Sequence, residues 1–153
     1  MMNIDQILHE TAETLRGFDF MEGIPVIVEE QGDPDGETEM RIAQQSLCAV
    51  VGEQSFTPKV QEPDPKSPNS GIGEVPVVIS IFEKPVINRA DENHQTIKAL
   101  SRRIGKELAW CQAPGMAAPL YLRRISPVSL FRLDGVDDAI VTRDVEMYTT
   151  AEL

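Results

Sequence analysis

Residues 75–83 have the sequence Val75-Pro-Val-Val-Ile-Ser-Ile-Phe-Glu83, and this stretch decides the fold. Most of its side chains are β-branched or aromatic and follow one another almost without interruption. Such a run is typical of a strand that is buried on both faces. Pro85 has no N–H to donate to a sheet ladder, so we expect the strand to end near Lys84. The rest of the chain must then pack against the two faces of this strand.

A helix is predicted to follow the strand and to begin after Asn93. Its apolar side chains recur at helical spacing and would face the strand: Ile97, Leu100, Ile104, Leu108 and Cys111. Its other side is basic: Lys98, Arg102, Arg103 and Lys106. Trp110, the single tryptophan, falls at the end of this helix and is predicted to be a core or subunit-contact residue. The strand, the turn and the helix form the central unit of the predicted fold.

Shorter patterns predict the remaining elements. Asn3 and Gln6 have the spacing of a capping box, at the start of a helix that Gly17 ends. Strands are predicted at residues 24–29, 120–125, 127–133 and 140–148, and a helix at residues 37–45. Residues 47–51 fit either a continuation of that helix or a strand, and we prefer the strand. Residues 140–148 alternate, which predicts a half-exposed antiparallel strand with its polar side, Thr142, Asp144 and Glu146, toward solvent.

Together these elements predict one α+β domain that spans residues 1–153. Its sheet would be mixed and mostly antiparallel, with four to five strands and two or three helices packed on it. Residues 55–73 contain four prolines among Lys, Ser, Asn and Gly, without periodicity. We therefore expect an exposed proline-rich loop or arm at about residues 55–73.

The composition is that of a folded globular protein, with 41% hydrophobic and 25% charged residues. A formal net charge of −11 argues against general nucleic-acid binding, because phosphate contacts require clustered Lys and Arg. No apolar run is long enough to span a membrane, and the start of the chain lacks the pattern of a secretory signal. Cys48 and Cys111 are therefore predicted to be reduced core thiols of a cytoplasmic protein.

The charges are unevenly distributed along the chain. Residues 1–40 carry eleven acidic side chains and one basic one, whereas residues 96–132 carry seven basic side chains and one acidic one. One interpretation is two separate solvated faces. The other is head-to-tail association, in which the acidic surface of one subunit meets the basic surface of the next and closes a ring.

The sequence shows no recognisable catalytic, cofactor-binding or metal-binding motif. Neither His9 nor His94 has a second ligand at metal-site spacing, and Ser126 and Ser129 have no glycine elbow beside them. The close glycine pair at Gly71 and Gly73 precedes a strand, whereas a phosphate loop follows one. We therefore expect no enzyme activity, no cofactor and no metal.

The turn after the central strand holds Glu83, Asn88 and Arg89. These residues would either cap the helix and bridge the bend, or contact another subunit. The basic side chains of the second half of the chain are the other candidates for subunit contact: Arg102, Arg103, Lys106, Arg123 and Arg124.

The order of elements resembles that of small tail-assembly proteins of long-tailed bacteriophages and prophages. The pieces that carry the resemblance are the strand at residues 25–30 with the turn at Gly32-Asp33, the buried strand at residues 77–83, the Phe-Glu-x-Pro-x-x-Asn-Arg turn that ends at residue 89, and the helix at residues 96–108. The resemblance implies a tail terminator or tail completion protein, made in the cytoplasm of the bacterial host and present in the virion tail. Such a subunit forms a ring, commonly a hexamer, that caps the tail tube and contacts the head–tail connector. The partners it implies are other copies of the chain, the tail tube and the connector, with no nucleic acid and no membrane. Residues 55–73 would then be an arm toward a neighbour or the tube.

The alternative is a small-molecule-binding or regulatory α/β module, of ferredoxin-like type, that acts as a dimer. That class would require a concave pocket with convergent polar groups.

Overall fold

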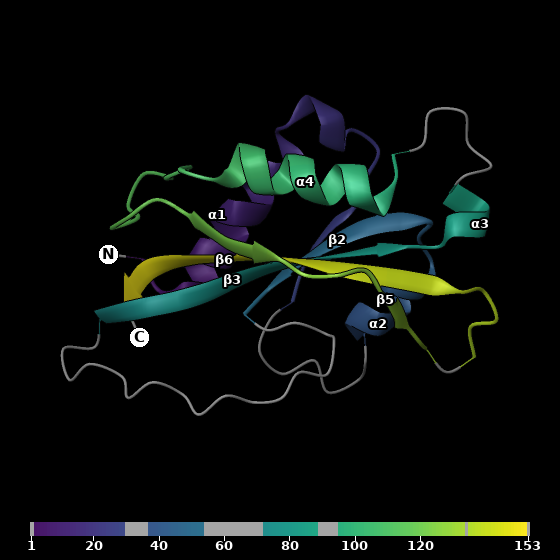
Figure 1. Ribbon diagram of the computed structural model, residues 1–153. Helices are drawn as coiled ribbons and strands as arrows, with labels where there is room; N and C mark the ends of the chain where they lie inside the picture. Colours follow the sequence, from purple (N-terminus) through teal and green to yellow (C-terminus); the bar gives the residue numbers. More distant parts are fainter. Residues whose placement is uncertain (1, 30–36, 54–71, 89–94, 134, 153) are drawn as a thin grey trace.

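The computed structural model describes residues 2–29, 37–53, 72–88, 95–133 and 135–152 (Figure 1). The described residues form helices, one short 3-10 turn and a six-stranded sheet. The elements are α1 (Ile4–Arg16), η1 (Asp19–Met21), β1 (Val26–Val28), α2 (Glu37–Ala43), β2 (Leu47–Gly52), β3 (Ile72–Glu83), α3 (Pro85–Asn88), α4 (Ile97–Leu108), β4 (Tyr121–Ile125), β5 (Ser129–Phe131) and β6 (Ile140–Glu152).

The sheet is mixed and mostly antiparallel, in the order β1-β2-β3-β6-β4. Only the β1–β2 pair among these strands is parallel. β3 and β6 are the long central strands and pair over their whole common length, from Ile72 opposite Glu152 to Glu83 opposite Val141. Along the other edge of β6, β4 pairs near Tyr148 and β5 pairs near Ile140. The predicted α+β fold and the mixed, mostly antiparallel sheet are confirmed. The described residues form six strands rather than the predicted four to five, because β4 and β5 pair with separate parts of β6, and four helices rather than two or three.

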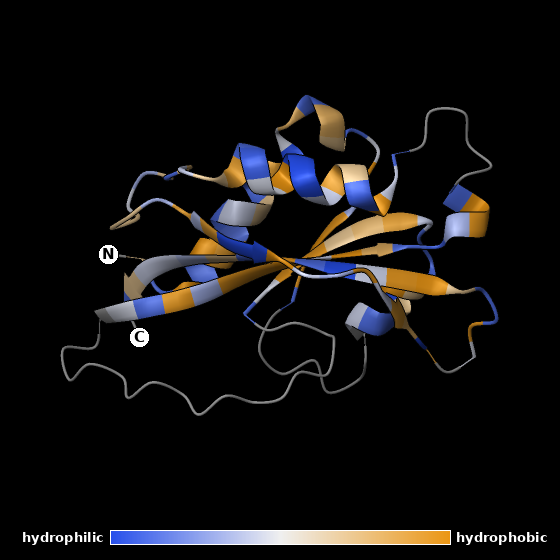
Figure 2. Cartoon of the chain, viewed as in Figure 1, coloured by the Kyte–Doolittle hydropathy of each residue, from blue (hydrophilic) through white to orange (hydrophobic). Residues whose placement is uncertain are grey.

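Two helices cover one face of the sheet. In Figure 1, α4 lies above the strands and α1 lies behind it, and both helices pack against the core that alternate residues of β3 form from Val75 to Ile81. Helix α1 begins at the predicted capping box, in which Asn3 Oδ1 accepts a hydrogen bond from the Gln6 N–H at 2.9 Å. Thr96 is the N-cap of helix α4, and its hydroxyl oxygen accepts a hydrogen bond from the Ala99 N–H. Figure 2 shows the hydrophobic residues of these helices toward the sheet and the hydrophilic ones on the outer side of α4.

The opposite face of the sheet carries a second, smaller apolar cluster. Ile42 of α2 packs there against Cys48, Val50 and Phe82, and partly buried apolar side chains at residues 131–136 close the cluster. Because both faces are covered there, β3 is buried on both sides from Val77 to Glu83, whereas Glu74 and Pro76 near its start are exposed. Residues 47–52 are a strand, which confirms the preferred interpretation of that segment.

The structure corrects the expectation for β6. Thr142 and Asp144 were predicted to face solvent, yet each is only 1% exposed. They lie on the face that the second cluster covers, and the Ser80 hydroxyl donates to Asp144 Oδ1 at 2.8 Å. The Asp144 N–H also donates to Ser126 Oγ at 2.9 Å. Because the Ser80 hydroxyl donates to it, the buried Asp144 carboxylate is tolerated where an isolated one would not be.

The structure tests the predicted proline-rich loop and the predicted absence of a membrane span only within the described residues. The proline-rich segment falls outside the described residues except for Ile72 and Gly73, which begin β3 rather than end a loop. In the part of the chain that the structure describes, no helix is both long and apolar enough to cross a membrane.

Candidate functional site

The turn after β3 is held together by a buried hydrogen-bond network. Glu83 is 1% exposed and Asn88 is 6% exposed. The Asn88 Nδ2 group donates to Glu83 Oε2 at 2.5 Å and to the Gln95 carbonyl at 2.8 Å. Gln95 in turn donates through Nε2 to the Phe20 carbonyl at 2.5 Å. The network thus ties the end of β3 to the start of α4 and to η1, so within the chain these side chains bridge the bend.

Both Glu83 and Asn88 are therefore inside the protein, and their contact with another subunit stays a prediction. Arg89, the third residue predicted in this turn, lies outside the described residues. The neighbouring Lys84 also points inward, because its ammonium group donates to the Ala43 carbonyl at the end of α2.

The two thiols differ sharply in environment. Burial raises the pKa of Cys48 to about 12, a rise that the nearby Lys84 charge partly opposes. Burial and, to a smaller extent, the negative charge of Glu107 raise the pKa of Cys111, which is only partly buried. Neither thiol has the lowered pKa of a catalytic or redox-active cysteine.

We expect a thiol-specific reagent at pH 8 to modify Cys111 in the folded protein and both cysteines in denaturant. Cys48 is protected by burial and remains a thiol, whereas the unfolded chain ionises normally. Because the raised pKa belongs to the folded state, the protein is expected to lose stability as the pH rises above 9, where only the unfolded Cys48 ionises. Counting modified thiols by mass spectrometry checks the first point. Rapid modification of both cysteines without denaturant would contradict it.

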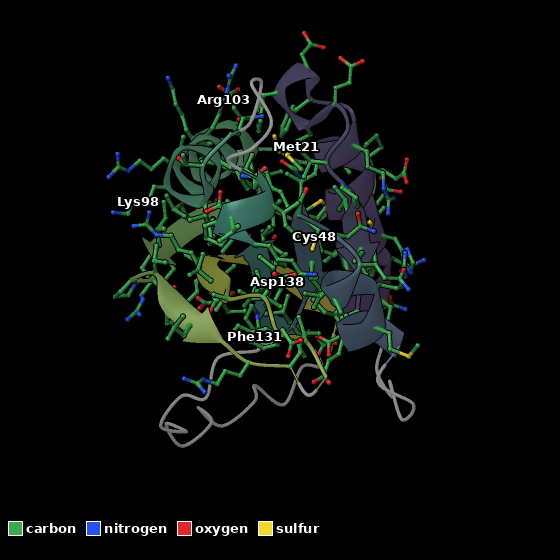
Figure 3. All side chains as sticks on the ribbon, turned by 90° about the vertical axis from the view of Figure 1, so that its right-hand side faces the viewer. Met21, Cys48, Lys98, Arg103, Phe131 and Asp138 are labelled. Carbon is green, nitrogen blue, oxygen red and sulfur yellow. The ribbon has the colours of Figure 1, made fainter. Side chains whose placement is uncertain are left out.

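The outer side of α4 is a basic face, which we define as Lys98, Arg102, Arg103 and Lys106. All four side chains are exposed, and the helix also exposes one acidic side chain, Glu107. Figure 3 shows Lys98 projecting away from the body of the protein. The Arg103 guanidinium lies over the Phe20 ring, 4.5 Å from its centroid, which holds that charge between α4 and η1.

The outer side of α1 and η1 is an acidic face, which we define as Asp5, Glu10, Glu13, Asp19 and Glu22. Four of these side chains are exposed and Glu10 is partly so. Arg16 is the only basic residue in this segment, and it is held by Glu13 at 2.5 Å and by the Val26 carbonyl at 2.7 Å. The five carboxylates and one arginine give this face a formal charge of −4. The acidic and basic faces thus belong to two helices that cover the same side of the sheet.

A third surface lies where β4 and β6 pair. Trp110 and Tyr121 meet edge to face with centroids 5.0 Å apart, and Tyr121 stacks on Tyr148 at 5.3 Å. The Arg123 guanidinium covers the other end, 4.7 Å from the Tyr148 centroid. We call these four residues the aromatic strip. Beside it, Arg124 Nε lies 2.7 Å from Glu146 Oε2, and Arg123 pairs with Glu74.

The sequence predicted Arg123 and Arg124 as contact residues but missed the aromatic strip. Trp110, Tyr121 and Tyr148 are far apart in the chain, and they meet only because Tyr121 is opposite Tyr148 in the β4–β6 register. The single signal in the sequence was the lone tryptophan, which was predicted to be a core or subunit-contact residue. Trp110 is 73% exposed, so it is not a core residue, and its subunit contact stays a prediction.

The described residues also form a shallow cavity of about 490 Å³ between β5 and β6, lined by residues 130–133 and 135–140. Its polar lining consists of Arg132, Asp137 and Asp138, which are exposed, and the rest is mostly apolar. Within the described ranges, no three His, Cys, Asp or Glu side chains gather closely enough to hold a metal ion.

Comparison with known proteins adds no assignment to this geometry. No family model matches the chain, and no curated protein matches it either.

Proposed function

We propose that this protein is a non-enzymatic structural subunit that associates head to tail into a closed ring. The observation that carries the proposal is the opposite charge of two neighbouring helix faces, acidic on α1 and η1 and basic on α4. Faces of opposite sign at different positions on one subunit favour a heterologous contact, in which each subunit uses both faces. Repetition of that contact closes a ring when the rotation between subunits permits.

The resemblance to phage tail-assembly proteins supplies the biological setting of the proposal. The ring, of about six subunits, would cap the tail tube and contact the head–tail connector. It would assemble in the cytoplasm of the bacterial host and remain in the virion tail. Partners would be other copies of the chain and tail proteins, without cofactor, nucleic acid or membrane.

The first test is the molar mass by light scattering at low and at high salt. At low ionic strength we expect a mass of about six 17.0-kDa subunits and a central hole in negative-stain images. High salt should shift the mass toward single subunits, because exposed charges are screened over a few ångströms at about 1 M salt. A single-subunit mass under all conditions would contradict the proposed association.

Charge reversal tests which faces are used. The variant Arg102→Glu with Lys106→Glu lowers the charge of the basic face from +4 to 0, and we expect it to lower association at least tenfold. The variant Glu10→Lys with Glu13→Lys changes the charge of the acidic face from −4 to 0 and should fail in the same way. An equimolar mixture of the two variants should form mixed dimers, because the unchanged acidic face of the first variant then meets the unchanged basic face of the second.

The matched control is Arg41→Glu with Arg132→Glu, which changes the net charge equally at exposed positions outside both faces. This variant should associate like the original chain. If the control loses association as strongly, or if the mixture stays dissociated, net charge rather than the two faces controls assembly.

The competing assignment is a small-molecule-binding module that acts as a dimer. It would use the cavity lined by residues 130–133 and 135–140. A salt-independent mass of two subunits would favour that assignment over the ring.

A further inference from the structure

The aromatic strip contains one exposed ring, Trp110, beside the half-buried rings of Tyr121 and Tyr148, and the chain holds Trp110 in an unfavourable backbone conformation. Trp110 is 73% exposed and has a φ angle of 72°, the only positive φ among the described residues other than glycine. A bulky residue rarely adopts this backbone conformation, and where it does the surrounding structure must enforce it. Here the Trp110 N–H donates to the Leu120 carbonyl at 2.7 Å, and the Leu120 N–H donates to the Cys111 carbonyl at 2.9 Å.

The rings of the strip form a continuous row. Three aromatic rings follow one another at spacings of 5.0 Å and 5.3 Å, across β4 and β6. Surfaces of successive exposed aromatic rings bind extended proline-rich segments, whose rigid backbone loses little entropy on binding. Exposed tryptophan and tyrosine also dominate the energetics of protein interfaces.

The charge beside the rings selects the kind of proline-rich segment. Arg123 in the strip and Arg124 beside it have side chains that are 53% and 57% exposed. The carboxylate partner of Arg123, Glu74, is 54% exposed, and an exposed ion pair of this kind contributes little and exchanges readily for another carboxylate. The partner of Arg124, Glu146, is only 18% exposed. The strip therefore suits a segment in which prolines alternate with acidic residues.

This chain contains such a segment. Residues 62–65 are Glu62-Pro63-Asp64-Pro65, with further prolines at positions 58 and 68. They lie in the stretch between Glu53 and Ile72 that is outside the described residues. An extended segment of residues 58–68 would span about 34 Å at roughly 3.1 Å per residue, which is more than the strip requires.

We propose that the aromatic strip binds residues 58–68 of a second copy of this chain. The choice of a second copy rests on the proposed ring. The match between the strip and the acidic Glu62-Pro63-Asp64-Pro65 motif, which lies between Lys59 and Lys66, does not depend on the ring. In the assembled protein, each subunit would then pass its proline-rich segment to a neighbour in addition to the contact between helix faces.

Trp110, the single tryptophan, gives a direct readout of binding. The test uses the full chain with Pro58, Pro63, Pro65 and Pro68 changed to alanine, so that its own segment no longer competes. We expect its tryptophan emission to be red-shifted relative to the original chain. A synthetic peptide of residues 55–70 should reverse the shift, with a dissociation constant between about 10 μM and 1 mM. The same peptide with alanine in place of its prolines should bind at least tenfold more weakly.

Matched substitutions in the same background locate the site. Tyr148→Leu keeps apolar bulk but removes the ring between Tyr121 and Arg123, and it should weaken peptide binding at least tenfold. Arg123→Gln keeps the rings and should weaken binding several-fold at low salt only. Leu130→Ala changes an apolar residue that is 65% exposed outside the strip, and it should leave binding unchanged.

Three outcomes would overturn the inference. In the first, the original and proline-free chains have identical emission and do not respond to the peptide. In the second, the alanine peptide binds as tightly as the unaltered peptide, and in the third, Leu130→Ala weakens binding as much as Tyr148→Leu.

Other outcomes separate the occupant and the ring. If the emission difference between the two chains persists at concentrations where light scattering finds only single subunits, the occupant is the segment of the same chain, and the second copy is excluded. Salt-sensitive rings without a peptide response would refute this inference and leave the proposed function intact. A peptide response from a protein that never associates would refute the ring and retain the proline-binding surface.

Discussion

Replacing Asn88 with aspartate is expected to lower the free energy of unfolding by about 3–5 kcal/mol at pH 8. Asn88 Nδ2 is the donor that lies 2.5 Å from Glu83 Oε2, and Glu83 is 1% exposed. The aspartate would replace this donor with a second carboxylate, in a position where water cannot separate the two charges. It would also lose the bond to the Gln95 carbonyl, which helps to place the start of α4.

The pH dependence distinguishes charge repulsion from a general packing defect. In the Asn88→Asp variant the paired carboxyls take up a proton more readily when folded than when unfolded, so the variant should regain stability as the pH falls from 8 toward 5. Urea denaturation across this range measures the effect. The matched control is Asn3→Asp, the same change at an exposed helix cap, where a carboxylate oxygen can accept from Gln6 N–H equally well. A loss that is equal at both pH values would show that repulsion is not the cause.

Replacing Gly105 with leucine is expected to cost about 3 kcal/mol of stability and to disturb both surfaces proposed for assembly. Gly105 lies in α4 at its contact with β4, where an added Cβ would be 3.3 Å from Ile125 Cδ1 and 3.5 Å from the Leu122 methyl groups. A leucine has no room there and would push the helix away from the strand. Since α4 carries the basic face and β4 carries part of the aromatic strip, both surfaces would shift.

A graded series checks the packing argument for Gly105. Gly105→Ala should change the free energy of unfolding by less than about 1 kcal/mol, because the gain in helix propensity offsets a tight but small contact. Lys106→Leu adds the same side chain at the next, exposed position and should be nearly neutral. Equal losses from Gly105→Leu and Lys106→Leu in urea denaturation would mean that the close contact with β4 is not the cause.

Local patterns in the sequence were sufficient for most elements. The β-branched run at residues 77–82 predicts a doubly buried strand because few other structures accommodate such side chains without a break. The spacing of Ile97, Leu100, Ile104 and Leu108 predicts α4, and all four side chains are buried against the sheet. Burial of apolar residues at a regular period is a local property of the chain, so it can be recognised without knowing the partner surface.

The burial of polar residues could not be predicted in this way. Thr142 and Asp144 alternate with apolar residues as an exposed face would, but a second apolar cluster covers that side of β6. Whether a polar side chain in a strand faces water depends on what packs above it and on partners such as Ser80, which is far away in the sequence. The burial of Glu83 and Asn88 could not be predicted for the same reason. The sequence places both in a turn, and only the packing of the turn buries them as a hydrogen-bonded pair.

The sequence by itself determined the α+β class, the central strand and helix, and the separation of acidic and basic residues along the chain. Only the tertiary structure decided that these charges lie on two helices of one sheet face, and that Trp110, Tyr121, Tyr148 and Arg123 form one surface. The physical reason is that strand and helix formation follow from neighbouring residues, whereas a surface is made by strand register and packing between segments distant in the chain.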